Sequence, residues 1–276
     1  GLILMPLIAW LIDPEADRLG WRHTAEILAA VTLISAVVLP KIIRNKPEDI
    51  SDHPDGQPPV VGESSSTAIE AGREEEQELT MGQALRTQAF WCISLGHGFG
   101  SMVVLAIMSH LGLLMSDHGY GLQTAAWIIM LQIAVSIVFQ FLGGWIGDLI
   151  PKNVALFIFT AIQGIGVVFL TLGSGIIYFY AFALLFGIGF GGRTPLTTAI
   201  RGDYFGRASF GKILGVSMIP MNILLLVAAP MAGFMRDELG DYDLAFLILA
   251  GFSMLGALLF LVARKPELPD LVTART

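Results

Sequence analysis

The sequence predicts an all-α polytopic membrane protein. Hydrophobic residues make up 54% of the chain and charged residues only 14%, whereas a soluble domain carries about 25% charged residues. Several apolar runs reach the roughly 20 residues that a helix needs to cross the hydrocarbon core of a bilayer. Because no water satisfies backbone groups there, such runs must be helical. One run also contains Arg193. A charge is costly to place in hydrocarbon, so this residue indicates that the protein binds or moves something polar within the membrane.

We expect eight membrane spans, in the following order along the chain: residues 1–12, 24–43, 89–116, 122–147, 153–172, 176–199, 211–235 and 243–263. The first residue is a glycine inside an apolar run, whereas a signal peptide opens with a methionine and basic residues. The first span is therefore expected to be cut, and the chain to be a fragment of a longer protein. The last span is almost wholly apolar, as expected of a supporting helix that faces lipid.

Residues 44–88 separate the second and third expected spans and have a different composition. They are rich in Pro, Gly, Ser and Glu, which predicts a polar linker, with a short amphipathic helix near Met81 to Thr87. The single cysteine, Cys92, excludes a disulfide within the chain. Basic residues form no cluster that would indicate a nucleic-acid partner.

Basic residues also predict the orientation, because connections rich in Lys and Arg stay on the cytoplasmic side. One set of connections carries most of them: Lys41, Arg44, Lys46, Arg73, Arg86, Lys152, Arg201, Arg207, Lys212, Arg264, Lys265 and Arg275. The other set carries Arg18, Arg22 and Arg236. The linker and the C-terminus are therefore expected on the cytoplasmic side of the inner membrane.

The two ends of the chain resemble each other. A proline precedes an aspartate by seven residues at Pro6 and again at Pro230. Each pair is followed by Leu-Gly, an apolar span and a basic stretch that ends in proline. Two copies of a larger unit would produce this pattern, which is typical of transporters that alternate access around a central site. With six spans in each copy, four spans would precede residue 1.

A short motif follows the fourth expected span. Gly144 and Asp148 are four residues apart, and Lys152 follows. This run resembles the cytoplasmic loop motif of the major facilitator superfamily. It departs from that motif at three positions, which are Leu149, Pro151 and Asn153.

Other stretches carry the same resemblance. Two further segments look like this superfamily, namely residues 202–215 and 239–246. Four segments are similar to bacterial relatives of monocarboxylate porters, namely residues 47–56, 79–91, 110–111 and 117–119. The resemblance implies a partial major-facilitator fold, divided into the last two helices of an N-terminal half (1–43), a cytoplasmic linker (44–88), a complete six-helix C-terminal half (89–264) and a tail (265–276).

The resemblance also implies a role for Asp148, whose carboxylate would pack against the cytoplasmic start of the span at 211–235. A carboxylate near a helix N-terminus is stabilised by the helix dipole, and breaking this contact would favour an inward-open state. The alternative is a solvated loop residue, although Gly143, Gly144 and Gly147 lie beside it.

Arg193 allows two interpretations. In the first, its planar fork faces a central cavity and binds a carboxylate. In the second, it lies about 9 Å from the cytoplasmic end of its span and pairs there with a carboxylate or with helix-end carbonyls, as part of a closing gate. The surrounding glycines allow a neighbouring helix to approach closely.

Polar residues in three further spans are candidates for the same site. Ser94, His97 and Ser101 share one face of the third span, and either His97 or His110 could relay protons, because the pKa of histidine lies near working pH. The alternative for each histidine is a hydrogen bond to a neighbouring helix. Similar polar candidates that could line the cavity or pin helices together are Gln132, Ser136, Gln140 and Asn222.

Together these observations predict a secondary active transporter, a symporter that moves a small organic solute. By resemblance, the solute is a monocarboxylate-like anion that travels with a proton. The alternatives are a non-transporting receptor or scaffold, and an intramembrane enzyme. The expected spans contain no pair of acids for such an enzyme, and we expect neither a metal nor a cofactor. The expected partners are the solute, the proton, the bilayer and the missing N-terminal half.

Overall fold

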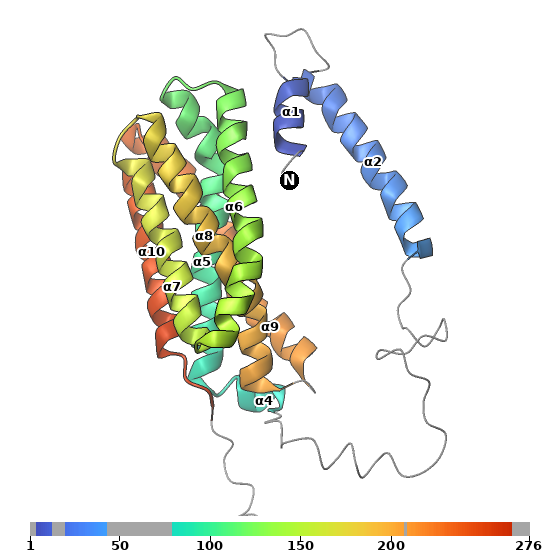
Figure 1. Cartoon of the computed structure of the whole chain (residues 1–276), viewed down its shortest axis with the longest axis vertical. Helices are drawn as coiled ribbons and strands as arrows, with labels where there is room; N and C mark the ends of the chain where they lie inside the picture. The colour runs from blue at the N-terminus through green and yellow to red at the C-terminus, as the bar shows by residue number, and fades with distance from the viewer. Residues whose placement is uncertain (1–3, 13–19, 43–78, 207–208, 267–276) are drawn as a thin grey trace, which may run out of the picture. The chain divides into compact units, whose positions relative to one another are not determined.

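The computed structural model describes residues 4–12, 20–42, 79–206 and 209–266. These residues form helices and short connections (Figure 1). Their contacts divide the chain into two compact units, one made of residues 77–276 with residues 1–6 and the other of residues 7–76. Most of the expected linker, residues 43–78, lies outside the described residues.

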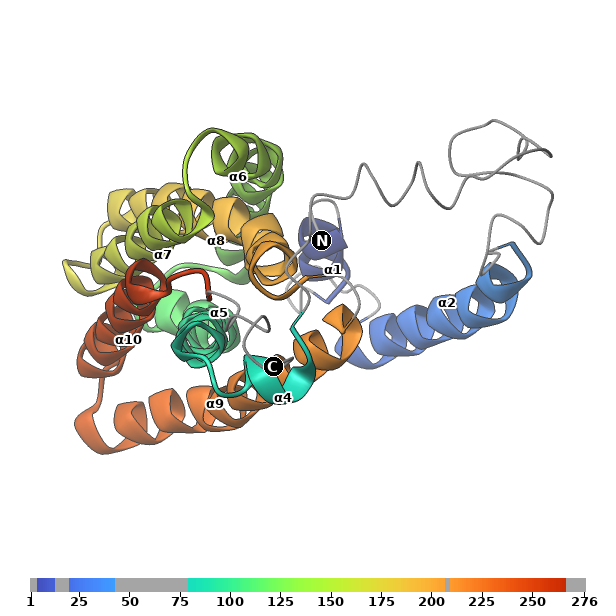
Figure 2. The same ribbon diagram turned by 90° about the horizontal axis from the view of Figure 1, so that it is seen from below.

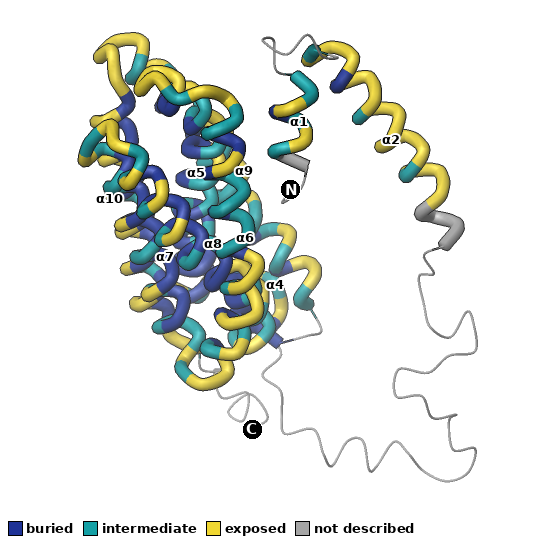
Figure 3. Tube along the Cα trace, turned by 45° about the horizontal axis from the view of Figure 1, so that its top comes forward, coloured by how far each residue is buried: buried dark blue, intermediate teal, exposed yellow. Residues whose placement is uncertain are grey.

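The N-terminal region contains α1 (Leu4–Ile12) and α2 (Gly20–Ile42). Helix α1 has nine residues, about 14 Å of helix, which is too short to cross a bilayer. The described part of α2 is long and apolar enough to cross, and most of its side chains are exposed (Figure 3). Seven described helices meet this standard, in agreement with the seven later spans that the sequence predicts.

The unit that contains residues 77–276 is a bundle of long helices: α5 (Gln88–Asp117), α6 (Leu122–Leu149), α7 (Lys152–Val168), α8 (Ile176–Phe205), α9 (Phe210–Leu239) and α10 (Asp243–Val262). A short 3-10 turn, η3 (Phe169–Thr171), extends α7. The helices agree with the expected spans, except that α8 continues six residues beyond the expected end at 199.

The bundle has an open edge. Helix α6 packs on α8, α8 on α7, α7 on α10, α10 on α5, and α5 on α9 (Figure 2). Only 17% of the most apolar stretch of α9 and 28% of that of α6 are buried, against 44–50% for the other four helices. Helices α6 and α9 are therefore the ends of this series, and their outer faces lack protein partners among the described residues.

The end of the expected linker belongs to the bundle. Helix α4 (Met81–Ala84) begins with a capping box, in which Thr80 and Gln83 satisfy each other's backbone N–H groups. Leu79 and Ala84 are buried, and Leu79 N donates to Phe205 O over 3.1 Å. The sequence prediction of a short helix here is confirmed, but residues 79–87 pack against the helices instead of forming part of a solvated linker.

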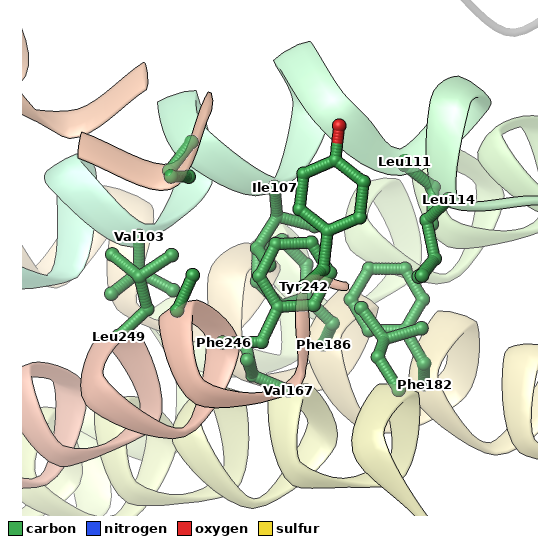
Figure 4. Close-up of a cluster of buried hydrophobic side chains, with 14 of the residues drawn as sticks. Val103, Ile107, Leu111, Leu114, Val167, Phe182, Phe186, Tyr242, Phe246 and Leu249 are labelled. Atoms are coloured by element: carbon green, nitrogen blue, oxygen red, sulfur yellow. The ribbon is translucent and has the colours of Figure 1, made fainter. Parts of the chain in front are cut away.

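Two apolar clusters occupy the two ends of the bundle. One is centred on Ile107, Phe182, Phe186 and Phe246, toward the end where α5 finishes (Figure 4). The other includes Phe90 and residues near the opposite end. Between and beside these clusters the helices carry buried polar side chains, and we call this group of residues the polar layer. Its buried polar side chains are Ser94, Gln132, Ser136, Thr160, Gln163, Arg193, Thr197, Arg201, Ser217 and Ser253.

Glycines hold the helices of the polar layer close together. A Cβ atom on Gly143 of α6 would lie 2.5 Å from Gly192 Cα of α8, and one on Gly189 of α8 would lie 2.5 Å from Gln163 N of α7. Real Cβ atoms do not approach backbone atoms so closely. The glycine-rich part of α8 therefore allows both neighbours to contact its backbone, as small residues do at helix interfaces in membranes.

Candidate functional site

The candidate site is the part of the polar layer where α8 carries two buried arginines. Arg193 is 2% exposed and Arg201 is fully buried. They are eight residues apart, a spacing that places both toward one side of the helix. Arg193 lies twelve residues before the end of α8 at Phe205, about 18 Å, and so lies deeper in the bundle than the 9 Å that the sequence predicts.

Arg193 uses one of its three side-chain nitrogens within the bundle. Its Nε donates to Gln163 Oε1 of α7 over 2.7 Å. Gln163 in turn donates from Nε2 to Gly100 O of α5 over 2.9 Å, and the guanidinium lies over the ring of Phe190 at 5.6 Å. Nη1 and Nη2 of Arg193 donate to none of the residues that the structure describes. Its terminal fork is therefore available to an acceptor.

Arg201, in contrast, uses all three nitrogens. Nε donates to Ser217 Oγ of α9 over 2.9 Å, Nη1 donates to Thr197 O one turn earlier in α8, and Nη2 lies 3.2 Å from His97 Nδ1 of α5. The guanidinium thus joins α8 to both α5 and α9. The sequence prediction placed Arg201 in a cytoplasmic connection, and this is wrong, because the helix continues past it.

The charge of the two arginines is not balanced nearby. Every partner described above is a neutral amide, hydroxyl, carbonyl or imidazole group, and no described carboxylate lies within ion-pair distance of either guanidinium. A buried charge is usually paired, because removal from water is costly. The two guanidinium groups therefore give the polar layer an excess of positive charge among the described residues.

The remaining candidates on α5 lie around this pair. His97 is partly buried and contacts Arg201. Ser94 is buried and donates to Phe90 O of its own helix over 2.6 Å, so it takes no part in the arginine network. Ser101 is partly exposed one turn after His97, on the same face of α5.

The polar stripe of α6 divides into two parts. Gln132 Nε2 donates to Ser136 Oγ over 3.1 Å, and Ser136 Oγ donates to Gly187 O of α8 over 3.2 Å. These two buried side chains therefore pin α6 to α8. Gln140 is exposed on α6, and Asn222 is exposed on α9, so these two belong to the helices at the open edge.

His110 lies in the other half of the bundle. Its Nε2 lies 2.9 Å from Ala229 O of α9, which can only accept, so Nε2 carries the hydrogen. Its Nδ1 lies 3.2 Å from the hydroxyl of Tyr242, and burial raises the pKa of that phenol, which keeps it protonated. Near the end of both helices, Arg236 of α9 pairs with Asp117 of α5 at 3.2 Å. These contacts favour the helix-joining interpretation of His110.

We expect His110→Leu to destabilise the bundle, because it removes two hydrogen bonds and leaves Ala229 O without its partner. The free energy of unfolding should fall by about 1–3 kcal/mol. Thermal unfolding of the purified chain measures this change, with Ser109→Ala, an exposed neighbour on the same helix, as the control. Equal thermal midpoints for His110→Leu and Ser109→Ala would contradict the structural role of His110.

The contact expected of the gate motif stays a prediction, because the structure describes only part of its surroundings. Asp148 is exposed and forms no ion pair or hydrogen bond with a described residue. Arg207, in the connection before α9, lies outside the described residues. Lys152 Nζ instead contacts Asp203 Oδ2 of α8 at 2.7 Å. Gly144 has no neighbour within 4 Å of a Cβ position, whereas Gly143 and Gly147 pack directly against α8.

Several site residues could not be identified from the sequence. No motif or spacing in the sequence distinguishes Gln163, Ser217 or Gly100, and their roles arise only from contacts between distant segments. Arg201 could have been recognised from the sequence, because it follows Arg193 by about two helical turns, with Thr197 halfway between them. Among the described residues, no group of three or more His, Cys, Asp or Glu side chains could hold a metal ion.

Comparisons with known proteins agree with this architecture. The family model described as Major Facilitator Superfamily matches residues 1–176 and 90–276. Monocarboxylate transporter 11 from Mus musculus is 24% identical over 273 residues, which cover 95% of this chain and 56% of that protein. Monocarboxylate transporter 13 from Bos taurus is 24% identical over 255 residues, which cover 91% and 54%.

A third relative has higher identity over a shorter region. Monocarboxylate transporter 12 from Xenopus laevis is 30% identical over 141 residues, which cover 50% of this chain and 30% of that protein. The chain thus spans about half the length of the curated relatives that it matches.

Proposed function

Because the chain belongs to the major facilitator superfamily, we propose that it acts in a secondary transporter that moves a small monocarboxylate-like anion, together with a proton, by alternating access. It is a multi-pass membrane protein, and seven apolar helices among its described residues are long enough to cross a bilayer. The observation that carries the proposal is the fork of Arg193, which lies in the polar layer with two nitrogens unused by the described residues.

The chemistry of this fork favours a carboxylate. The two terminal nitrogens of a guanidinium present parallel N–H groups that match the two oxygens of a carboxylate. Gln163 fixes the third nitrogen and thereby sets the direction of the fork. The names of the relatives, all monocarboxylate transporters, fit the same solute class. Only Arg193 has a fork with unused nitrogens, since Arg201 uses all three of its own, and a single fork favours one carboxylate over a dicarboxylate.

Access to Arg193 requires movement, since its side chain is only 2% exposed. Helix α9 is the best candidate for the moving element. It contains Pro220 and Pro230, it lies at the open edge, and near its start the side chain of Arg201 joins it to α8. Prolines remove backbone hydrogen bonds and permit bending. In this proposal, the open edge between α6 and α9 faces the other half of the transporter.

The distribution of charge supports a cytoplasmic location for the end that carries α4. Described residues at that end include Arg86, Lys152, Lys212, Arg264 and Lys265. The opposite end of the bundle carries Arg236 among a group of acids: Asp117, Asp237, Glu238, Asp241 and Asp243. Basic residues remain on the cytoplasmic side during insertion.

Proton coupling in this proposal uses His97. Arg201 donates to His97 Nδ1, and this requires that Nδ1 carry no proton. The charged groups that act on His97 within the described bundle are Arg193 and Arg201. A carboxylate bound to Arg193 would reduce their repulsion of a protonated imidazole. Anion and proton would then each favour the binding of the other, as linkage requires.

We expect His97→Gln to separate anion movement from proton movement. Glutamine can still accept a hydrogen bond from Arg201, but it cannot be protonated. Uptake should lose its dependence on an imposed pH gradient while affinity for the anion remains measurable. His110→Gln is the matched control and should keep that dependence. If uptake by the His97→Gln protein still depended on the pH gradient, the proton would bind elsewhere.

The transport proposal is tested with the complete reading frame that contains these 276 residues, purified and reconstituted in liposomes. We expect saturable uptake of a labelled short-chain monocarboxylate from a panel that also contains dicarboxylates, sugars and amino acids. The unlabelled monocarboxylate should also raise the thermal midpoint of the purified protein. A stabilising monocarboxylate without any uptake would indicate a receptor, and stabilisation by none of the panel would reject an anion site at Arg193.

A further inference from the structure

A second binding region lies on the outside of the bundle, away from Arg193. A cavity of about 400 Å³ lies between the first turns of α5 and the first half of α9. Its wall is apolar and consists of Phe90, Trp91, Leu95, Val216, Ile219, Pro220, Ile223 and Leu224. We call it the outer groove. Along α9 it extends from Val216 to Leu224, nine residues or about 12 Å of helix, parallel to the direction of the spans.

A polar cavity lies beside one end of the outer groove. It measures about 340 Å³ and is lined by residues 87–89 and 264–266. Arg264 and Lys265 are exposed there, and neither has an ion-pair partner among the described residues. Gln88 of this polar cavity lies on the same face of α5 as Trp91 and Leu95 of the outer groove, at spacings of three and seven residues.

Other side chains place the junction of the two cavities at a membrane surface. Trp91 is 48% exposed, and its indole N–H donates to Leu85 O over 3.0 Å. Tryptophan with one apolar and one polar side is enriched at the boundary between lipid and water. Lys212 is exposed one turn before Val216 on α9, so a third basic residue lies at the same end of the groove.

We propose that the outer groove and the polar cavity together bind an anionic phospholipid of the surrounding bilayer. The acyl chain would lie in the groove, and the headgroup would contact Arg264 and Lys265. Charge complementarity identifies the occupant. The outer groove is apolar and ends at basic side chains without an ion-pair partner among the described residues, which matches a lipid with a negatively charged headgroup. Basic residues at a membrane surface attract such lipids. The site uses no residue of the arginine network, so it goes beyond the proposed transport function.

Fluorescence of Trp91 provides a direct test. Replacing Trp10, Trp21, Trp127 and Trp145 with phenylalanine leaves Trp91 as the only tryptophan of the chain. The chain is reconstituted in bilayers that contain either a brominated phosphatidylglycerol or a brominated phosphatidylcholine, because bromine on an acyl chain quenches a tryptophan in contact with it. We expect brominated phosphatidylglycerol to quench Trp91 at a mole fraction at least about fivefold lower than brominated phosphatidylcholine does. This is the preference expected of one basic side chain near an anionic surface.

The controls separate a built site from general contact with lipid. A chain that keeps only Trp145, which is 61% exposed near the corresponding end of α6, should be quenched equally by both lipids. The double variant Arg264→Gln, Lys265→Gln should lose the preference at Trp91, whereas Lys152→Gln should keep it. Circular dichroism and size-exclusion chromatography establish that each variant is folded.

Three results would overturn the proposal. Equal quenching of Trp91 by the two lipids would show that the groove does not select a headgroup. An anionic preference that survives in the double variant would place the selective contact elsewhere. Loss of the preference in millimolar inorganic phosphate would indicate a site for free anions and not for a lipid.

Discussion

Arg193→Gln is expected to weaken anion binding by the protein strongly. The variant keeps a polar side chain in the polar layer but loses the charge and the paired N–H groups of the fork. Removing one partner of a buried charged pair typically costs 2–5 kcal/mol, so affinity should fall by about 30-fold or more. Arg193→Lys keeps a charge without the fork and should weaken binding by about tenfold. The ligand-induced rise in thermal midpoint measures affinity, and liposome uptake by the complete reading frame measures transport.

The matched control is Arg86→Gln, because Arg86 is exposed at the end of the bundle and has no contact with the arginine network. It should leave monocarboxylate affinity unchanged. Unchanged affinity in Arg193→Gln would remove the central residue from the proposed function. Impaired folding of that variant is distinguished from lost binding by the midpoint without ligand.

A second variant displaces the guanidinium of Arg193 without replacing that residue. A Cβ atom on Gly100 of α5 would lie 3.1 Å from Arg193 Cζ and 3.2 Å from Nη1, close enough to displace the guanidinium. Gly100→Ala should therefore reduce anion affinity while the charge of Arg193 remains. Gly112→Ala is the control, because no atom lies within 4 Å of a Cβ at that position of the same helix.

Gly143→Ala is expected to have the largest effect on stability. The added Cβ would lie 2.5 Å from Gly192 Cα and still closer to Gly192 O, both backbone atoms of α8. A rotamer change cannot relieve a clash with backbone, so α6 and α8 must separate. Overpacking in a core costs about 1–3 kcal/mol and occasionally more. The thermal midpoint of the purified chain should fall clearly.

The adjacent residue provides a close control. Gly144 shares the chemistry and the helix of Gly143, but a Cβ there would meet nothing within 4 Å. Gly144→Ala should leave the midpoint unchanged or raise it slightly, because alanine has a higher helix propensity than glycine. A similar loss of stability in both variants would show that the close approach of Gly143 to α8 is not the cause.

Most of the fold could be predicted from the sequence. Hydropathy alone locates the helices of the bundle, because a run that crosses a bilayer must be both long and apolar. The ends of helices are harder to locate, as α8 shows. The segment from Arg201 to Gly206 contains charges and glycines and looks like a connection, yet the helix continues there because α5 and α9 supply acceptors for the guanidinium.

The candidate site was predictable only in part. Arg193 could be identified because a permanent charge in an apolar run is costly. Its partner Gln163 could not, since a glutamine thirty residues away carries no sign of which helix it contacts. The resemblance to a known motif also predicted a contact for Asp148 that none of the described residues provides. Sequence patterns locate unusual residues well, but they do not determine which neighbours those residues find.

The hydrogen bond between Arg193 and Gln163 has a consequence for how the chain is synthesised. Among the helices of the bundle, α8 has the lowest mean hydropathy, 1.5 against 1.8–2.5 for the others, so it is the least able to partition from the translocon into lipid on its own. Helix α7 leaves the ribosome first and brings the carboxamide of Gln163. We therefore expect α8 to enter the membrane efficiently only when α7 is already positioned next to the translocon.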